Sequence, residues 1–391
     1  MRKIICTLAL IAAIGSASAQ KFQQLLDRIV SESPELKALE LEHAAESEAM
    51  AQENILAGPE LEGNHKWGTR GENKYGVGIS QNFDWPGLYK ARSAARKAND
   101  NALLQLRLSS ADNRRLEVKL LMIEYVTTGE QLRVITDAVH NMSRLSELYQ
   151  RGFEAGEESI LDVNKLKIEK LRLMRRETQL REQREQLLET LLATAGNNSF
   201  APELKSLSLA DLPADAIADE AEYEQRIDRS PNMQYYRSMH EACLQSERVA
   251  RLSGYPTLGI GYELEREDGQ YFNGFSVSIG LPSWSNGHRK ASARYQAMAQ
   301  EVQMDAARLG EILKMRRLRT AALRAAGERD IFSEVLASSN QPELLMKALK
   351  GGQISLMTYL MEVGYFLDAT CDYYETVNNA ARLCAELNKY K

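Results

Sequence analysis

Two long stretches of the chain repeat apolar and charged positions with the period of an α-helix. Each follows a glycine, Gly87 or Gly287, and continues for more than 60 residues almost free of Gly and Pro. Each ends at a glycine-containing break, LYQRGFEAGEESILDV or LMKALKGGQISLMTY, and a shorter helical pattern comes next. Because amphipathic patterns of this length are typical of paired helices, the sequence predicts unusually long helical hairpins.

The chain also repeats itself. Gly156 matches Gly352 at an offset of 196, and Ser33-Pro34 recurs as Ser230-Pro231 at nearly the same offset. A period this long exceeds that of solenoid repeats and indicates a duplicated domain. The predicted parts of the chain are a signal peptide at 1–19, a first repeat at 20–195, a connector at 196–230 and a second repeat at 231–391.

The two repeats have the same predicted internal order. Ser-Pro opens a first helix, with Ser as the N-cap and Pro at the first helical position, and this helix ends near Ala57 or Ser253. Two short strands and a long helix come next. We expect each long helix to pair with two shorter helices stacked end to end. The long helices are predicted at Leu88–Phe153 and His288–Lys350, and the tip turns after them at 153–159 and 350–355.

Four short segments alternate apolar and polar residues with the period of a β-strand. They lie at about 59–67, 74–85, 256–265 and 271–281. Alternation of this kind fits the half-buried sheet of a soluble protein equally well. The polar positions, however, are mostly Gly, Ser, Asn and Asp, which suit the lumen of a transmembrane β-barrel, and strands of roughly 9–11 residues span a membrane.

Aromatic residues mark the ends of these strands, where a membrane barrel carries its aromatic girdles. Four strands cannot close such a barrel, since the smallest have about eight, so the chain must oligomerise. A dimer would supply eight strands and no pore, whereas a trimer would supply twelve and a channel, and we expect the homotrimer. The fold class is mainly α with a small β part. The predicted membrane-interface residues are Trp67, Trp85, Trp284, Tyr89 and Tyr271.

The N-terminus and the charge balance bear on localisation and partners. Arg2 and Lys3 precede an apolar run at 4–14, and Ala17-Ser18-Ala19 forms a small-residue cleavage pattern, which together indicate a secretory signal peptide. The sequence holds 49 Lys and Arg against 54 Asp and Glu. This interspersed, slightly acidic balance argues against a nucleic-acid partner.

The sequence offers no catalytic constellation. Five histidines are scattered along the chain, without a zinc-protease, nucleophile-elbow or phosphate-loop motif. We therefore expect no enzymatic activity, no catalytic residue, no cofactor and no metal site. Three cysteines follow the signal peptide, and an odd number excludes a fully paired disulfide framework.

The whole pattern resembles the TolC-like outer-membrane factor family, the exit ducts of tripartite efflux pumps. The resemblance covers the duplication, the two strands per copy, the long helices and the glycine-containing turns. Two segments, AGPELEGNHKW and GISQNFDWPGLYKARSAARKA, are most similar to the heavy-metal (cobalt–zinc–cadmium resistance) branch. The resemblance implies an outer-membrane channel of an efflux or type I secretion system, with a long periplasmic extension. Its implied partners are a periplasmic adaptor protein, an inner-membrane transporter and outer-membrane lipid.

In that family the glycine break is the turn at the periplasmic tip, where the adaptor docks, and it follows the pattern Gly-x-x-Ser-x-x-Asp-Val. The second copy departs from this pattern, because Thr358 and Tyr359 replace the Asp-Val pair. Asp162 in the first copy and Glu362 in the second are the candidates for an acidic ring that narrows the channel at the tip. Because Asp162 has no acidic match at Thr358, the two turns are not expected to control opening in the same way. The matching residues are Gly156, Ser159, Asp162 and Val163 in the first copy and Gly352 and Ser355 in the second.

Simpler interpretations remain open at this level. Each break can be a helix–turn–helix corner without a docking role, since Gly permits the turn and Ser can cap the returning helix. The alternative function is a periplasmic coiled-coil scaffold or adaptor with no channel, although a scaffold gives no reason for every tryptophan to lie at a strand end. The exported substrate cannot be derived, because a duct need not bind what it conducts.

Overall fold

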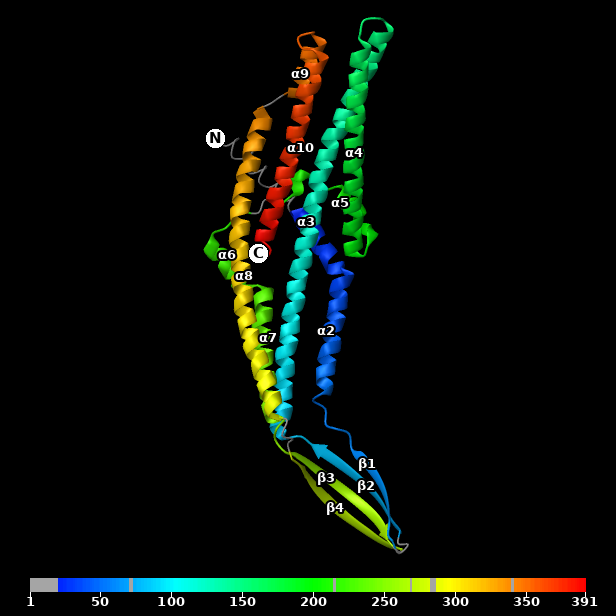
Figure 1. Cartoon of the computed structure of the whole chain (residues 1–391), viewed down its shortest axis with the longest axis vertical. Coiled ribbons are helices and arrows are strands. Elements are labelled where there is room, and N and C mark those ends of the chain that lie inside the picture. The colour runs from blue at the N-terminus through cyan, green and yellow to red at the C-terminus, as the bar shows by residue number, and fades with distance from the viewer. Residues whose placement is uncertain (1–19, 70–72, 214–215, 268, 282–285, 339–340) are drawn as a thin grey trace, which may run out of the picture. The chain divides into compact units, whose positions relative to one another are not determined.

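The computed structural model describes residues 20–69, 73–213, 216–267, 269–281, 286–338 and 341–391. Within these residues the chain is mainly helical and contains one four-stranded antiparallel sheet (Figure 1). The predicted fold class is therefore confirmed in its α and β content. The predicted signal peptide at 1–19 and Trp284 lie outside the described residues.

Helices before and after each pair of strands recur in both halves of the chain. The helices are α2 (Pro34–Gln52), α3 (Pro86–Glu154), α4 (Ile160–Ala195), η1 (Asn198–Phe200), α5 (Ala201–Lys205), η2 (Leu209–Asp211), α6 (Glu220–Arg229), α7 (Pro231–Leu252), α8 (Asn286–Ser338), α9 (Gln341–Lys350) and α10 (Leu356–Leu387). The strands are β1 (Glu60–Trp67), β2 (Asn73–Phe83), β3 (Thr257–Glu267) and β4 (Gln270–Gly280).

The second long helix is described as two helices, α8 and α9, with residues 339–340 between them outside the described residues. The sequence signal for a helix start here is Pro342, which lies in the first turn of α9. Proline is tolerated in a first turn, because the amide that it lacks would have no partner within the helix.

The two Ser-Pro pairs do not start their helices in the same way. Ser230 caps α7 as predicted, since its side chain accepts a hydrogen bond from the Met233 amide at 3.2 Å. α2 also begins at its proline, Pro34, as predicted, and the Ser33 carbonyl accepts a hydrogen bond from the Lys37 amide at 3.3 Å, but the buried side-chain oxygen of Ser33 has no hydrogen-bond partner. The backbone is alike at the two positions: each serine follows a helical stretch, and its amide bonds three residues back, Ser33 to the Val30 carbonyl at 3.2 Å and Ser230 to the Ile227 carbonyl at 3.0 Å.

The first of these helices is also shorter than the sequence pattern indicated. α2 ends at Gln52, five residues before Ala57. The chain then tightens into single turns in which the amides of Asn54 and Ile55 bond three residues back, to Ala51 and Gln52. Asn favours such turns over helix interiors, because its side chain competes for backbone hydrogen bonds.

Two compact units make up the chain, and both α3 and α8 contribute residues to each. Of the described residues, unit 1 holds 20–37 together with those within Ala111–Arg226 and Ile312–Lys391, and unit 2 holds those within Ala38–Ser110 and Ile227–Glu311. The helical stretch 20–32, which the sequence interpretation missed, supplies four side chains to the core of unit 1. Their spacing of three and four residues places them on one helical face. They are Phe22, Leu25, Leu26 and Ile29.

The sheet belongs to unit 2 and joins the two repeats. Its strand order is β1-β2-β3-β4, and every neighbouring pair is antiparallel. The central pair, β2 with β3, brings together strands that are almost 200 residues apart, with Ile79 opposite Tyr262. Both repeats therefore contribute one hairpin to a single continuous sheet.

Candidate functional site

Each hairpin of unit 1 turns through a corner centred on a glycine. In the first corner, between α3 and α4, the Gly156 amide donates to the Phe153 carbonyl at 3.0 Å, and the Glu157 amide donates to the Gly152 carbonyl at 2.8 Å. These two bonds form a Schellman motif, which satisfies carbonyl groups at the end of α3. The motif needs a residue in the left-handed conformation, and Gly156 adopts it with a φ of 78°.

The second corner, between α9 and α10, has the same geometry. The Gly352 amide donates to the Leu349 carbonyl at 3.0 Å, and the Gln353 amide donates to the Ala348 carbonyl at 2.9 Å. Gly352 has a φ of 68°. All four positions match those of the first corner at the offset of 196, so the two repeats build one backbone corner twice.

A serine begins the returning helix after each corner. Ser159 accepts a hydrogen bond from the Leu161 amide at 3.1 Å, and Ser355 accepts one from the Thr358 amide at 3.1 Å. These bonds satisfy amides that the first helical turn leaves unpaired. Glycine and serine together therefore end one helix and start the next within a few residues, which keeps the corner tight.

The other predicted tip residues differ in their exposure. Val163 is completely buried, and Tyr359, its equivalent in the second repeat, is 4% exposed. Asp162 is half-buried and forms an ion pair with Lys165 at 3.0 Å, whereas Glu362 is exposed. Val163 and Tyr359 thus share a core position, and the two aperture candidates lie in different environments.

Apolar side chains pack the two hairpins of unit 1 against each other. Burial raises the pKa of the Tyr359 hydroxyl in this cluster. Burial also raises the pKa of Tyr149, and the carboxylates of Glu158 and Asp162 add to the effect. The buried members of the cluster are Ala138, Met142, Leu145, Leu166, Leu173, Leu356, Tyr359 and Leu367.

A groove of about 600 Å³ lies between α3 and the second hairpin. Its lining includes the apolar side chains of Met346 and Phe366 and the charged side chains of Asp137, Glu343 and Lys350. The sequence interpretation did not identify this groove, because it forms only when the two repeats pack together. An apolar groove edged by charges can hold an amphipathic helix.

One face of the sheet exposes a continuous apolar surface. Leu61, Ile79, Tyr262 and Phe275 lie opposite one another across all four strands. Exposure is high at the edge strand, where Phe275 is 84% and Val277 75% exposed. A surface of this kind marks contact with lipid or with another protein.

The opposite face of the sheet is polar and rich in small residues. A Cβ atom at Gly76 would lie 2.6 Å from the side-chain oxygen of Asn64, so glycine there makes room for the neighbouring side chain. Charges gather toward the hairpin ends, where Lys74 pairs with Glu265 at 2.7 Å and with Glu267 at 3.5 Å. The sequence interpretation described this face as mostly Gly, Ser, Asn and Asp and did not name Glu265 or Glu267.

Most of the predicted interface aromatics are exposed. Trp67 and Tyr271 lie at hairpin ends and are 75% and 68% exposed. Trp85, at the other end of β2, stacks on Tyr255 with ring centres 5.6 Å apart. Tyr89 is half-buried, and its hydroxyl accepts a hydrogen bond from the Asp84 amide at 3.0 Å, so it ties the end of the strand to α3.

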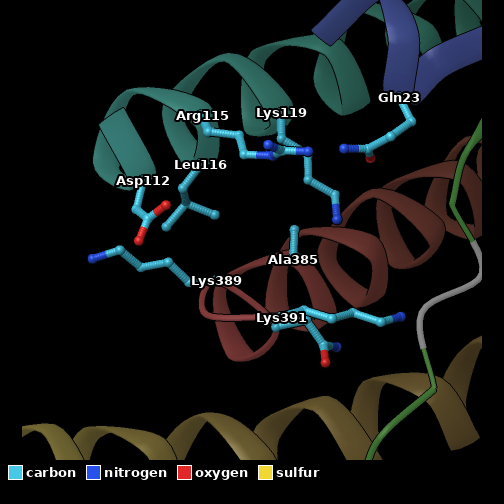
Figure 2. A pocket seen from close by; sticks show the side chains of 9 residues that line it. Gln23, Asp112, Arg115, Leu116, Lys119, Ala385, Lys389 and Lys391 are labelled. Atoms are coloured by element: carbon cyan, nitrogen blue, oxygen red, sulfur yellow. The ribbon is translucent and has the colours of Figure 1, made fainter. Parts of the chain in front are cut away.

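A second hollow in unit 1, of about 330 Å³, has four basic side chains in its lining (Figure 2). Arg115 and Lys119 reach it from α3, and Lys389 and Lys391 from the residues after α10. Burial raises the pKa of Asp112 in the same hollow. Lysines at the end of α10 complement the negative end of the helix dipole, which accounts for part of this charge.

None of the helices in the described ranges is both long and apolar enough to cross a membrane. The same ranges contain no group of three or more His, Cys, Asp or Glu side chains placed to hold a metal ion.

Comparison with known proteins finds similarity in structure. No protein-family model matches the sequence, and no curated protein matches it significantly. Among solved structures, a membrane protein from Pseudomonas aeruginosa matches with a TM-score of 0.79 at 14% identity, over 95% of this chain and 92% of that one. The outer membrane protein VceC from Vibrio cholerae matches with a TM-score of 0.70 at 12% identity, over 95% of both chains.

The Campylobacter jejuni CmeC outer membrane channel matches with a TM-score of 0.76 at 14% identity, over 95% of this chain and 85% of that one. In each case the match includes nearly the whole of this chain, helices and sheet together. The chain therefore has the fold of solved outer-membrane channel proteins.

Proposed function

We propose that the chain is an outer-membrane channel that acts as a passive exit duct in a tripartite efflux or type I secretion system. The observation that carries the proposal is the exposed apolar face of the four-stranded sheet, on a chain that shares the fold of solved outer-membrane channels. A water-soluble scaffold would bury such a face, whereas lipid would cover it.

Closure of the sheet requires further copies of the chain. Both edge strands, β1 and β4, have one unpaired side within the described chain, and open edges are not tolerated in lipid. Three copies would supply twelve strands and enclose a lumen lined by the polar face. We therefore propose a homotrimer in the outer membrane, with its helices extending into the periplasm.

The two corners are the proposed contact sites for a periplasmic adaptor, through which the duct would reach an inner-membrane transporter. Gly156 and Gly352 are exposed, and a side chain added at either would meet no other atom within 4 Å. The groove between α3 and the second hairpin provides an apolar binding surface beside the second corner. Exposed corners next to such a groove suit a helical partner.

Membrane extraction tests the channel. The full-length protein, extracted in detergent, should run on a gel as a heat-resistant trimer and should conduct ions in a planar lipid bilayer. Complete release of the protein by osmotic shock would contradict the proposal and would favour a periplasmic scaffold.

Bulky substitutions at the corners test the docking role. The paired change Gly156→Phe and Gly352→Phe should abolish export while leaving the trimer in the membrane, because the added side chains meet open space and the backbone strain of about 1–2 kcal/mol at each positive φ is confined to the corners. Unchanged export would count against docking at these corners. Loss of the trimer would instead show that the corners are needed for assembly.

The exported substrate is a separate question. The similarity of two segments to the heavy-metal efflux branch suggests metal ions. A strain that lacks the gene should then become sensitive to divalent metal ions and keep its resistance to dyes and detergents. The opposite sensitivities would assign the duct to drug efflux.

A further inference from the structure

The apolar face of the sheet ends in a row of basic and aromatic side chains. Near the hairpin ends, one residue of each strand lies directly opposite its neighbour on the next strand. These residues share the apolar face, because each is an even number of positions along its strand from an apolar member of that face. All of them are exposed. In strand order, the row is His65, Tyr75, Arg266 and Tyr271.

Ring contacts join the members of the row. The His65 ring stacks on the Tyr75 ring, with centroids 4.3 Å apart. The Arg266 guanidinium lies 5.6 Å from the centre of the Tyr271 ring. Trp67 lies beside the row, with its ring centroid 5.5 Å from that of His65. A guanidinium is attracted to the face of an aromatic ring, so this contact restrains the position of the positive charge.

The charge of Arg266 is separated from the other charges of the hairpin ends. The lysines and glutamates there lie on the polar face and pair with one another, with Lys74 2.7 Å from Glu265. On the apolar face, the described strands carry two basic residues, His65 and Arg266, and no carboxylate. Arg266 forms no ion pair within the described residues. Its charge is therefore available to an anion outside the chain.

The distance along β3 places Arg266 at the edge of the apolar surface. Between Leu258 and Arg266 the strand extends about 26 Å, at about 3.3 Å per residue. In a barrel with strands tilted by about 40°, this corresponds to ~20 Å across the membrane, close to the roughly 25 Å of an apolar band. A cation in the middle of that band is costly, whereas one at its edge is tolerated. Arg266 would thus lie at the level of the lipid headgroups.

We infer that this row binds the phosphate-bearing headgroup of an anionic lipid. The inference rests on the proposed insertion of the apolar face into a membrane. The lipid would belong to the leaflet around the hairpin ends, which are the strand ends that no helix continues (Figure 1). The Arg266 guanidinium can donate two hydrogen bonds to one phosphate, and the hydroxyls of Tyr75 and Tyr271 are further donors. The acyl chains would cover the apolar side chains next to the row, a contact that inorganic phosphate cannot make.

The fluorescence of Trp67 tests the inference, because its ring lies beside the row. Trp85→Phe with Trp284→Phe leaves Trp67 as the single tryptophan of the full-length protein. The trimer is reconstituted into vesicles that contain equal amounts of phosphatidylcholine and phosphatidylglycerol. Bromine on the acyl chains of one lipid at a time quenches a tryptophan that this lipid touches. We expect phosphatidylglycerol to occupy the site about 5-fold more often than phosphatidylcholine, the preference that one cation gives at a membrane surface.

Substitutions separate the row from the overall charge of the hairpin ends. Arg266→Gln should bring the occupancy of the two lipids close to equality. Lys66→Gln is the matched control, because it removes a positive charge beside His65 but on the polar face, and it should leave the preference unchanged. An equal loss of preference in the two variants would overturn the inference.

Salt gives a second readout that needs no change in the row. The preference should fall as the salt concentration rises, because exposed charges are screened beyond about 10 Å at 0.1 M and at shorter range in higher salt. A preference that does not depend on salt would contradict binding through the Arg266 charge.

The protein with an unchanged row separates this inference from the proposed function. If neither brominated lipid quenches Trp67, the apolar face does not lie in a membrane, and the proposed function and this inference both fail. If both lipids quench it equally, the face lies in lipid as proposed, and only the inference fails.

Discussion

At the scale of single residues, Gly156 and Gly352 hold a backbone conformation that other residues adopt at a cost. Both have positive φ, and an added side chain would meet open space, so only the backbone is strained. We expect Gly156→Ala to lower the free energy of unfolding by about 1–2 kcal/mol. Gly310→Ala, within α8 and also in open space, should instead raise it by about 0.5–1 kcal/mol. Denaturant unfolding followed by circular dichroism measures both, and equal effects would contradict the argument.

Asp228 gives the stability of unit 2 a predictable pH dependence. Its carboxylate accepts hydrogen bonds from the Arg308 guanidinium at 2.7 and 3.0 Å, and this pairing holds the pKa of Asp228 below its usual 3.8. Because the pKa of Asp228 is lower in the folded state than in the unfolded state, the pairing stabilises the protein at pH values above the unfolded-state pKa. That stabilisation is lost as the pH falls through the folded-state pKa.

We therefore expect Asp228→Asn to reduce stability at pH 7 by up to ~1 kcal/mol, the range for exposed pairs. The difference from the unmodified protein should vanish at a pH below the folded pKa. Thermal unfolding at several pH values gives the measurement. Asp305→Asn, which removes a carboxylate of α8 that forms no ion pair among the described residues, is the control. A pH-independent loss in Asp228→Asn would rule out this account.

At the scale of helices, the serines that precede them provide a matched set of substitutions. Ser230→Ala and Ser355→Ala each remove a cap and should destabilise the protein by about 1 kcal/mol. Ser33→Ala removes a buried oxygen that has no hydrogen-bond partner, so it should be neutral or stabilising. Thermal unfolding of the three variants compares them, and a loss in Ser33→Ala equal to that in Ser230→Ala would contradict the distinction.

The same helices show what a sequence can predict and where prediction ends. The starts of α4 and α10 follow from local chemistry, because a glycine and a serine a few residues apart suffice to end one helix and cap the next. Ser33 carries the same local signal, and α2 starts after it as predicted, yet its side chain forms no capping hydrogen bond. The groove beside α9 could not be derived, since it depends on how two distant repeats pack.

At the scale of the whole molecule, the two faces of the sheet suit two different environments, one apolar and one aqueous. Alternation along each strand predicted an apolar and a polar face, because successive side chains point to opposite sides. The pairing of β2 with β3 could not be read from that alternation, since it depends on contacts between residues almost 200 positions apart. That pairing turns two small hairpins into one continuous apolar surface, which supports the proposed insertion into a membrane.

Two lysine substitutions on β4 separate the faces within one strand. Val277 is on the exposed apolar face, opposite Ile260, whereas Gly274 is on the polar face, opposite Glu263. Val277→Lys would place a charge in lipid and should cost about 2–4 kcal/mol near the midplane. Gly274→Lys would extend toward the proposed lumen and should be tolerated, because nothing in the described chain lies within 4 Å of an added Cβ there.

The amount of heat-resistant trimer in the membrane fraction reports both effects. We expect Val277→Lys to reduce it strongly and Gly274→Lys to leave it near the unmodified level while lowering the conductance for cations, since a ring of lysines would then line the lumen. If both variants insert equally well, lipid does not cover the apolar face, and a protein partner must. If only Gly274→Lys fails to insert, the sheet faces the membrane the other way round, which its exposed Phe275 and Leu281 argue against.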